Sequence, residues 1–274
     1  MTPLGAGSPG QPGENAPPVL YEIDAGIATI TLNRPKRLNA WTTAMEVGYF
    51  DLLEQAAADA EVRVIIVTGA GRGFCSGADM EDLRDTDREA NARRRAERPM
   101  TFPLRIPKPV IGAINGACAG LGLAQALMCD LRFAAAGAKF TTAFSRLGLP
   151  AEHGTAWHLT ELVGMSVALD LLYSSRVVLA EEALELGLVN RVAQPDQLMA
   201  TTREYARALA EQASPSSMAA MKRQVYWGRE DERAASLARS YELQASALQD
   251  EDFDEGVRAF KERRKPAFRP LPRS

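Results

Sequence analysis

Two glycine-containing turns carry the residue types and spacing in this chain that would support catalysis. The first turn spans residues 69–79 and follows an apolar, β-branched stretch. The second lies within residues 111–130, where Gly120 and Gly122 precede another apolar run. A strand, a glycine turn and a helix start leave backbone N–H groups unpaired and directed at one point. Two such turns lying side by side would offer two N–H donors to one developing oxyanion.

Three functions compete for turns of this kind: phosphate binding, a purely structural turn and a paired oxyanion site. The nucleotide-binding fingerprint requires glycine where the chain has Phe74, and no Gly-Lys-Ser/Thr sequence follows, which excludes a P-loop. For any single turn the structural role is the commoner one. Nucleophilic catalysis has less support, because Cys75 has no neighbouring histidine in the sequence. Ser76 and Ser145 lie outside a Gly-x-Ser-x-Gly motif.

The composition is that of an ordinary globular protein. The net charge of −3 gives no basic excess for binding nucleic acid or an anionic membrane surface. No apolar run is long enough to span a bilayer, and the N-terminus lacks a secretory signal pattern. Cys75, Cys118 and Cys129 lack CxxC spacing, so we expect reduced structural thiols in a cytoplasmic protein without a metal site.

Hydrophobic periodicity predicts a β/α core around the two turns. Residues 1–18 contain five prolines and four glycines, which is typical of a disordered tail. We expect a β-hairpin over 19–23 and 27–32, then a helix capped by Thr42 or Thr43 and ending near Ala58. Further strands are expected at 62–68, 109–114, 131–134, 139–141 and 189–192, and further helices at 79–83, 123–128, 155–163, 167–173 and 180–186.

The remaining segments complete the predicted domain organisation. Residues 84–98 hold six arginines and four acids, which favours a solvated surface segment over a cover for a site. Four prolines from residue 99 to residue 109 predict that the chain comes back from this segment in an extended conformation. From residue 195 the pattern is helical, over 195–213, 215–228, 231–249 and 252–263. We therefore predict an α/β core at 19–194, followed by a helical C-terminal region at 195–274.

Several short motifs, taken in their order, are similar to a known family. They are Asn33-Arg34-Pro35 with Asn39-Ala40, the GFCSGAD run of residues 73–79, Lys108-Pro109-Val110 through Asn115-Gly116, Met128-Cys129-Asp130, and Glu255-Gly256 with Ala259-Phe260 and Arg263. Across roughly residues 19–270 they resemble the crotonase superfamily of enoyl-CoA hydratases and isomerases. The resemblance implies a crotonase-like fold, a spiral ββα core with a helical C-terminal trimerisation region.

The resemblance also implies a substrate and a set of contact residues. The substrate would be an acyl-CoA thioester, with coenzyme A as part of the substrate and no separate cofactor. The backbone N–H groups of Ala78 and Leu121 would polarise the thioester oxygen and stabilise an enolate. Residues expected to contact the substrate or its CoA are Lys36, Arg37, Gly77, Asp79 and Gly120. We also interpret Asp79 as a helix cap.

The two glutamates that hydratases of the family carry have no counterpart here. The motif alignment places them at Ala124 and Phe144, neither of which can transfer a proton. The adjacent Gln125 carries an amide, which is not a general base. Isomerase branches of the family carry one carboxylate a little later, after a Leu-Gly-Leu-Pro loop, and Glu152 holds that position. The resemblance therefore points to Glu152 as the proton carrier.

Sequence position alone leaves the role of Glu152 open. The structural alternative is a carboxylate that is favoured at a helix start by the helix dipole. The apolar neighbours Leu147, Leu149 and Trp157 are expected to raise the pKa of Glu152, as acid–base catalysis requires. His153 is a candidate for orienting Glu152, although a histidine at the rim of a loop is an equally good interpretation.

These inferences lead to one expected reaction and three alternatives. We expect isomerisation of a 3-enoyl to a 2-enoyl thioester, with Glu152 as the proton shuttle. The alternatives are hydration of a 2-enoyl-CoA, hydrolysis of a CoA ester, and a non-catalytic acyl-CoA-binding subunit. The resemblance implies a homotrimer or homohexamer, whereas the amphipathic C-terminal helices alone would be equally consistent with packing on their own core.

Overall fold

The computed structural model describes residues 16–79, 81, 97–227, 249–264 and 266–270. Its strands are β1 (Val19–Asp24), β2 (Ile27–Leu32), β3 (Val64–Gly69), β4 (Gly73–Cys75), β5 (Val110–Ile114), β6 (Ala117–Ala119), β7 (Leu131–Ala135), β8 (Lys139–Thr141), β9 (Val178–Leu179) and β10 (Arg191–Ala193). Its α-helices are α1 (Thr43–Ala58), α3 (Leu121–Leu127), α4 (Thr155–Val163), α5 (Met165–Ser174), α6 (Ala180–Glu185), α7 (Leu198–Gln212), α8 (Pro215–Trp227) and α10 (Glu251–Glu262). Short 3₁₀ turns are η1 (Pro35–Arg37), η2 (Phe102–Arg105) and η3 (Ser145–Leu147). No helix in these ranges has the length and apolar character needed to cross a membrane.

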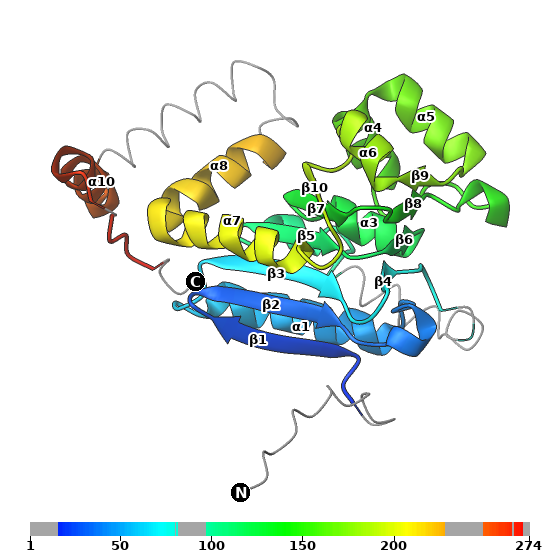
Figure 1. The fold of residues 1–274 in the computed structure, drawn as a ribbon, viewed down its shortest axis with the longest axis horizontal. Helices are drawn as coiled ribbons and strands as arrows, with labels where there is room; N and C mark the ends of the chain where they lie inside the picture. Colours follow the sequence, from blue (N-terminus) through cyan, green and yellow to red (C-terminus); the bar gives the residue numbers. More distant parts are fainter. Residues whose placement is uncertain (1–15, 80, 82–96, 228–248, 265, 271–274) are drawn as a thin grey trace, which may run out of the picture.

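Six of the described strands form the larger sheet, in the order β1-β2-β3-β5-β7-β10 (Figure 1). β1 and β2 pair antiparallel, from Val19 opposite Leu32 to Asp24 opposite Ile27. The other neighbours pair parallel. Every residue of β3 and β5 is buried, as expected for central strands of a parallel sheet that is covered on both faces.

The smaller sheet has the order β4-β6-β8-β9 among the described strands. β4, β6 and β8 are parallel neighbours, and β9 runs antiparallel to β8. Along the chain β3, β5 and β7 of the larger sheet are each followed by β4, β6 and β8 of the smaller one. Each repeat therefore adds one strand to each sheet, which places the connection after β3 beside the connection after β5. The predicted α/β core with a helical C-terminal part is confirmed.

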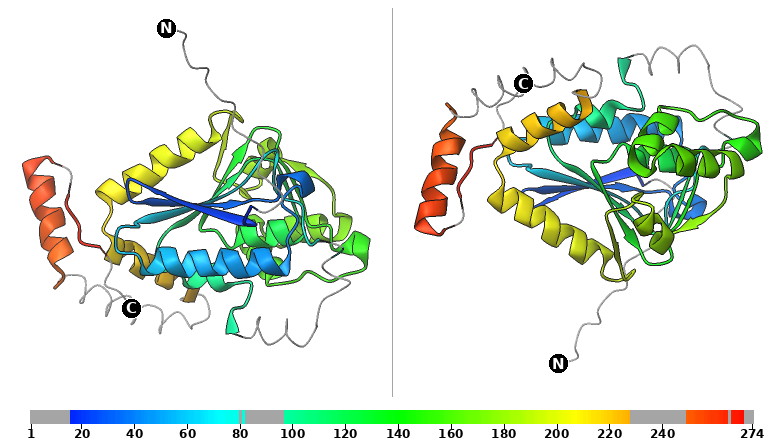
Figure 2. Two further views of the ribbon diagram at one scale, coloured as in Figure 1. Left: turned by 90° about the horizontal axis from the view of Figure 1, so that it is seen from below. Right: turned by 90° about the horizontal axis from the view of Figure 1, so that it is seen from above.

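Helices α1 and α7 cover opposite faces of the larger sheet (Figure 2). α1 begins after Thr42, whose hydroxyl accepts a hydrogen bond from the Met45 N–H at 3.2 Å. Its inward face buries Met45, Tyr49 and Leu53. α3 is buried along its whole length and packs against β4, β6 and α4. The glycine turns are therefore attached to a rigid, close-packed interior.

Most of the predicted elements are confirmed, with ends that differ by a few residues. These include the hairpin, the helix capped by Thr42, the strands and helices expected between 109 and 192, and helices α7, α8 and α10. The predicted helices at 79–83 and 231–249 and the arginine-rich segment 84–98 lie wholly or mostly outside the described residues. The same holds for residues 1–15 of the predicted tail, while Pro17 and Pro18 accept hydrogen bonds from Asn33.

One local expectation was wrong, and the short strands β4, β6 and β9 were not expected. The proline-rich return between 99 and 109 is not fully extended, because it contains the 3₁₀ turn η2. Pro103 lies in the first turn of η2, where a missing N–H costs no helical hydrogen bond. Of these strands, β9 is too short to show an alternating pattern. It is held by pairing with Lys139 and Phe140 of β8.

Helix α8 is joined to the core through the carboxylate of Asp130, which directly precedes β7. The Lys222 ammonium donates to Asp130 Oδ2 at 2.8 Å and to the carbonyl oxygens of Pro103 and Lys108 at 3.3 and 3.2 Å. The Tyr226 hydroxyl donates to Asp130 Oδ1 at 3.0 Å. Burial and the neighbouring Asp130 charge raise the pKa of Tyr226. One ammonium group thus links α8, η2 and the start of β5.

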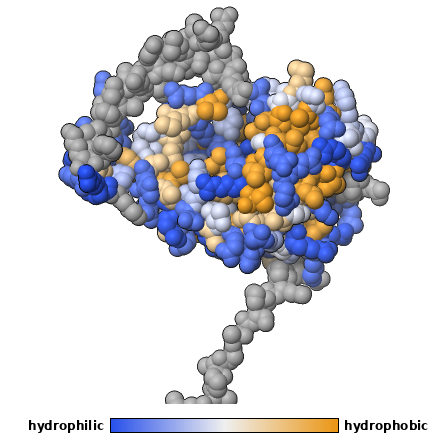
Figure 3. All heavy atoms as spheres, turned by 45° about the horizontal axis from the view of Figure 1, so that its top comes forward, coloured by the Kyte–Doolittle hydropathy of each residue, from blue (hydrophilic) through white to orange (hydrophobic). Residues whose placement is uncertain are grey.

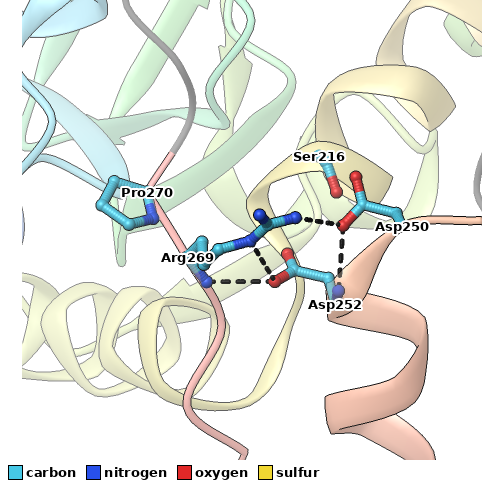
Figure 4. A pocket seen from close by; sticks show the side chains of 5 residues that line it. All are labelled: Ser216, Asp250, Asp252, Arg269 and Pro270. Atoms are coloured by element: carbon cyan, nitrogen blue, oxygen red, sulfur yellow. Dashed lines mark hydrogen bonds and ion pairs between the residues drawn. The ribbon is translucent and has the colours of Figure 1, made fainter.

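The chain after α10 returns to the core and is held there by charged groups. Arg63 donates to the carbonyl oxygens of Phe268 and Arg269 at 2.8 and 3.2 Å. The Arg269 guanidinium lies 2.9 Å from Asp250 Oδ1, and the Arg269 N–H donates to Asp252 Oδ1 at 3.0 Å. Asp250, Asp252 and Arg269, together with Ser216 and Pro270, line a small cavity between the first turns of α8 and α10 (Figure 4). Because its charged groups pair with one another, we interpret it as a structural junction.

The variant Lys222→Met tests the link between α8 and the core. It leaves the Asp130 carboxylate largely enclosed without its cation. Loss of a charge-assisted hydrogen bond costs about 1.5–3 kcal/mol, so we expect the free energy of unfolding to fall by about 2 kcal/mol in urea denaturation followed by circular dichroism. The control is Lys139→Met, at an exposed position of β8, which should change stability little. Equal stability of the two variants would contradict this role of Lys222.

Candidate active site

The two glycine turns lie side by side in the structure. Their flanking strands pair in parallel, with Cys75 of β4 opposite Cys118 of β6. The backbones approach too closely for a side chain at two crossings. A Cβ atom on Gly116 would lie 2.2 Å from the carbonyl oxygen of Arg72, and one on Gly122 would lie 2.1 Å from the carbonyl oxygen of Cys75. Glycine is therefore required at both positions for the turns to meet.

Two asparagine side chains hold the first turn in shape. Asn39, which is fully buried, donates to the carbonyl oxygens of Gly73 and Ala70 at 2.7 and 3.0 Å. From the other side Asn115 donates to the carbonyl oxygen of Gly69 at 2.8 Å and accepts the Gly69 N–H at 3.2 Å. These bonds give the carbonyl groups of the turn partners from side chains outside it.

The backbone N–H of Ala78 points away from the β-bridge that this segment forms with Trp41. Trp41 donates its N–H to the Gly77 carbonyl at 2.7 Å, and the Asp79 N–H donates to the Trp41 carbonyl at 2.9 Å. This parallel bridge uses the residues on either side of Ala78, so the Ala78 N–H faces the opposite side of the chain. Among the described residues it has no acceptor. Gly77, at φ +108°, makes the bend before it.

The N–H of Leu121 is the second unpaired donor. Leu121 is the first residue of α3, so its N–H has no partner within the helix. No other acceptor for it occurs in the described part of the chain. Gly77 and Gly120 face each other, since a Cβ built on Gly77 would lie 4.0 Å from the Leu121 nitrogen and one built on Gly120 would lie 3.9 Å from the Gly77 Cα. The structure therefore brings the Ala78 and Leu121 segments into contact at these two glycines.

The two positions where the resemblance places hydratase glutamates are apolar and enclosed. Ala124 is fully buried in α3, and Phe144 is 4% exposed. The neighbouring Gln125 is also buried and donates its amide to the Met100 carbonyl at 3.1 Å. None of these three side chains can carry a proton to and from carbon.

Glu152 lies in the loop between η3 and α4. Its side chain is 39% exposed, and its Oε2 lies 4.0 Å from Nε2 of His153. His153 has φ +55°, an uncommon conformation for a residue other than glycine. The catalytic role of Glu152 and the orienting role of His153 remain predictions at this point.

The apolar residues expected around Glu152 are partly exposed in the single chain. Leu147, Leu149 and Trp157 are 61%, 43% and 44% exposed in the single chain. They flank Glu152 in the sequence, and their effect on its carboxyl group stays a prediction.

Two of the predicted contact residues, Lys36 and Arg37, lie in η1, and a third, Asp79, directly follows Ala78. Lys36 and Arg37 of η1 are exposed, and Arg37 lies 3.3 Å from Glu81. Asp79 is buried, and its Oδ1 accepts the Glu81 N–H at 3.1 Å, while the helix that it is expected to cap lies mostly outside the described residues. Its Oδ2 accepts a hydrogen bond from Arg34 at 2.8 Å. The sequence contains both residues of this ion pair but gives no sign that they meet.

The three cysteines are free and buried. Burial raises the pKa of the Cys75 thiol to about 12 and also raises the pKa values of Cys118 and Cys129. A buried thiol with a raised pKa is a poor nucleophile, which agrees with their interpretation as structural. The described residues contain no cluster of three or more His, Cys, Asp or Glu side chains suited to a metal ion.

Comparison with known proteins gives a consistent result. The sequence model of the Enoyl-CoA hydratase/isomerase family matches residues 22–270. The chain is 35% identical to 1,2-epoxyphenylacetyl-CoA isomerase of Escherichia coli K12, over 91% of this chain and 97% of that protein. The crystal structure of an enoyl-CoA hydratase from Bacillus anthracis is similar with a TM-score of 0.87 at 29% identity, over 92% and 99% of the two chains. One from Mycobacterium marinum is 51% identical over 77% and 98%, with a TM-score of 0.68.

The variant Gly122→Ala tests the contact between the two turns. Its Cβ would overlap the Cys75 carbonyl, and since backbone on both sides fixes this contact, α3 must move. We expect loss of activity and a clear drop in thermal stability by differential scanning calorimetry. In the control Gly48→Ala, within α1, the Cβ would meet Val19 at an ordinary 3.6 Å. Alanine is a better helix former by about 1 kcal/mol, so unchanged or higher stability is expected there. A fully active, stable Gly122→Ala enzyme would refute the steric argument.

Proposed function

Because this chain belongs to the enoyl-CoA hydratase/isomerase family, a member of the crotonase superfamily with the corresponding fold, we propose that it isomerises the double bond of an enoyl-CoA thioester. The single observation that supports this most is the pair of unpaired N–H groups, of Ala78 and Leu121, on contacting segments. The apolar Ala124 and Phe144 favour isomerisation over hydration, because Glu152 is the only one of the three candidate positions that carries a carboxylate.

The two N–H groups would act on the thioester oxygen. As a proton leaves C2 of the substrate, negative charge moves onto that oxygen and an enolate forms. Donors held by a fixed backbone stabilise this charge without reorganising, and each is typically worth about 3–4 kcal/mol of barrier. The turns supply such donors, because Gly77 and Gly120 set the backbone that carries them.

Glu152 would carry the proton between two carbon atoms. Its carboxylate takes a proton from C2 of a 3-enoyl thioester, so the C2–H bond breaks and a dienolate forms. The protonated Glu152 then returns the proton at C4, a C4–H bond forms, and the double bond lies between C2 and C3. One carboxylate suffices, and no water is added. His153, at 4.0 Å from the Glu152 carboxylate, would orient it.

The remaining assignments follow the same proposal. The CoA portion would lie along η1 and residues 77–79, with Lys36 or Arg37 meeting a phosphate group. Gly77, Asp79 and Gly120 would border the thioester. No cofactor beyond the CoA of the substrate is required by this chemistry. Three free, buried cysteines agree with a cytoplasmic location.

Isomerisation and the role of Glu152 are tested in one experiment. Purified enzyme is incubated in D₂O with a 3-enoyl-CoA and, separately, with a 2-enoyl-CoA, and the products are analysed by mass spectrometry and NMR. The wild type should shift the double bond without adding water. Glu152→Gln should lower turnover by about 100-fold or more, since acid–base catalysis contributes about 10²–10⁴. Affinity for the ester should change little.

The control variant is Glu185→Gln, which changes an exposed carboxylate at the end of α6 and should retain full activity. Addition of water to the 2-enoyl-CoA would identify a hydratase instead. Release of free CoA would identify a hydrolase. Binding of the ester without any turnover by the wild type would favour a non-catalytic subunit.

We also propose that the chain forms a homotrimer or homohexamer. Figure 3 shows apolar side chains gathered on the side of the molecule where α4 and α5 lie. Met165, Leu169 and Tyr173 of α5 are 70%, 38% and 74% exposed, and Trp157 of α4 is 44% exposed. An apolar area of this kind on a single chain is typical of a surface that is covered by another protein chain.

Self-association is tested by light scattering. Three chains of 29.7 kDa would give a mass near 89 kDa, and six would give twice that. The double variant Met165→Asp/Tyr173→Asp should lower the observed mass, because charge in a desolvated interface opposes association. Glu185→Gln serves again as the control. A monomeric mass for the wild type at all concentrations would contradict the proposal.

A further inference from the structure

The ion pair between Arg34 and Asp79 stands next to the proposed oxyanion donor Ala78. Arg34 Nη1 donates to Asp79 Oδ2 at 2.8 Å and to the Ala40 carbonyl at 2.6 Å. The Asp79 side chain is only 8% exposed, and that of Arg34 is 27% exposed. The two residues are 45 positions apart in the sequence, so only the fold brings them together.

Arg34 is itself fixed by the loop that contains it. Its N–H donates to Asn39 Oδ1 at 2.8 Å, and the Asn39 N–H donates to the Arg34 carbonyl at 3.0 Å. Asn39 is in turn bound to the Gly73 carbonyl. The guanidinium group therefore projects from a closed loop that is attached to the glycine turn, and it reaches Asp79 from a defined position.

Ala78 is consequently held on both sides by this loop. The backbone bridge to Trp41 holds Gly77 and Asp79, and the guanidinium of Arg34 holds the Asp79 side chain. The direction of the Ala78 N–H depends on the peptide planes that these contacts fix. A backbone donor stabilises an oxyanion only while it is aimed at the position of the developing charge.

The charge of Arg34 has a second consequence. The Asp79 carboxylate follows Ala78 directly in the chain, and a negative group so close to a developing oxyanion would raise the barrier. The adjacent guanidinium offsets this charge. The pair can thus hold the backbone firmly without imposing a net negative potential on the site.

We propose that Arg34 is a positioning residue for catalysis: acting through Asp79, it fixes the Ala78 N–H and neutralises the carboxylate beside it. This inference rests on the proposed function, because it requires that the Ala78 N–H binds the thioester oxygen. It predicts that Arg34 affects the turnover number far more than substrate binding.

Steady-state kinetics of three variants test the proposal. Arg34→Gln should lower kcat by about 10-fold or more, with KM for the enoyl-CoA changed less than about threefold. In Arg34→Gln/Asp79→Asn the carboxylate charge is gone, while the amide oxygen of the new side chain still accepts the Glu81 N–H, so much of the kcat should return. Arg176→Gln breaks another Arg–Asp pair, with Asp170 on α5 at 2.9 Å, and should leave kcat unchanged.

The outcome of the double variant separates compensation of the Asp79 charge from simple stabilisation of the fold. If Arg34 only stabilised the fold, the double variant would be no more active than Arg34→Gln, and kcat would follow the melting temperature across the series. Either result would overturn the proposal. A loss of kcat/KM in Arg34→Gln that comes entirely from a higher KM would also overturn the proposal, since Arg34 would then serve substrate binding.

A spectroscopic measurement separates this proposal from the proposed function. Butanoyl-CoA, a saturated thioester that cannot isomerise, is bound to each protein and its carbonyl stretch is recorded by infrared difference spectroscopy. The wild type and Glu152→Gln should shift the band to lower frequency, and Arg34→Gln should shift it less. No shift with the wild type would refute the oxyanion site itself. Equal shifts for the wild type and Arg34→Gln would refute only the role of Arg34.

Discussion

The segments that carry Ala78 and Leu121 can meet because no side chain stands between their backbones. At the start of α3, Gly122 packs directly on the Cys75 carbonyl, and Gly116 packs on the Arg72 carbonyl in the same way. These contacts leave no tolerance for a Cβ atom, so the spacing between the turns is set by van der Waals contact of main-chain atoms. Two N–H groups held at such a contact are preorganised for an oxyanion, because neither depends on a side-chain rotamer.

Polar side chains hold the first turn in the conformation that its glycines allow. Asn39 and Asn115 bind the carbonyl oxygens of the first turn from two directions, and Arg34 binds the carboxylate that follows Ala78. Each of these three side chains lies in or directly beside a buried interior, where a hydrogen bond that is not made costs more than in water. The same groups that satisfy the turn therefore also restrict its motion. Fold stability and the geometry of the candidate site depend on the same few residues.

In the proposed mechanism the reaction depends on side chains that the fold of the two turns does not require. Ala124 and Phe144 are buried and apolar, so they fit the packing of α3 and of the segment after β8 without altering the turns. Glu152 lies on a loop, between η3 and α4, where a carboxylate can be gained or lost at small cost to the core. Relatives named as hydratases and as an isomerase are both similar in sequence to this chain, as expected if one fold carries more than one reaction.

The sequence by itself determined the elements that local periodicity and capping control. The hairpin, the Thr42 cap, the buried strands and helix α4 ending at Gly164 follow from patterns that span fewer than about twenty residues. Its glycine and asparagine motifs also predicted the family and the two turns. It failed where local rules compete, as for the 3₁₀ turn at Pro103, and where too few residues carry a pattern, as in β9.

Only the tertiary structure decided which groups meet. The contacts of Gly122 with Cys75, of Asn39 with Gly73 and of Arg34 with Asp79 join residues far apart in the chain, and no local pattern encodes such pairs. The exposure of Leu147 and Trp157 around Glu152 likewise depends on how a loop turns relative to the core. Hydrophobic periodicity shows on which side of its own helix or strand a residue lies. Which other element packs against that side is fixed by the fold of the whole chain.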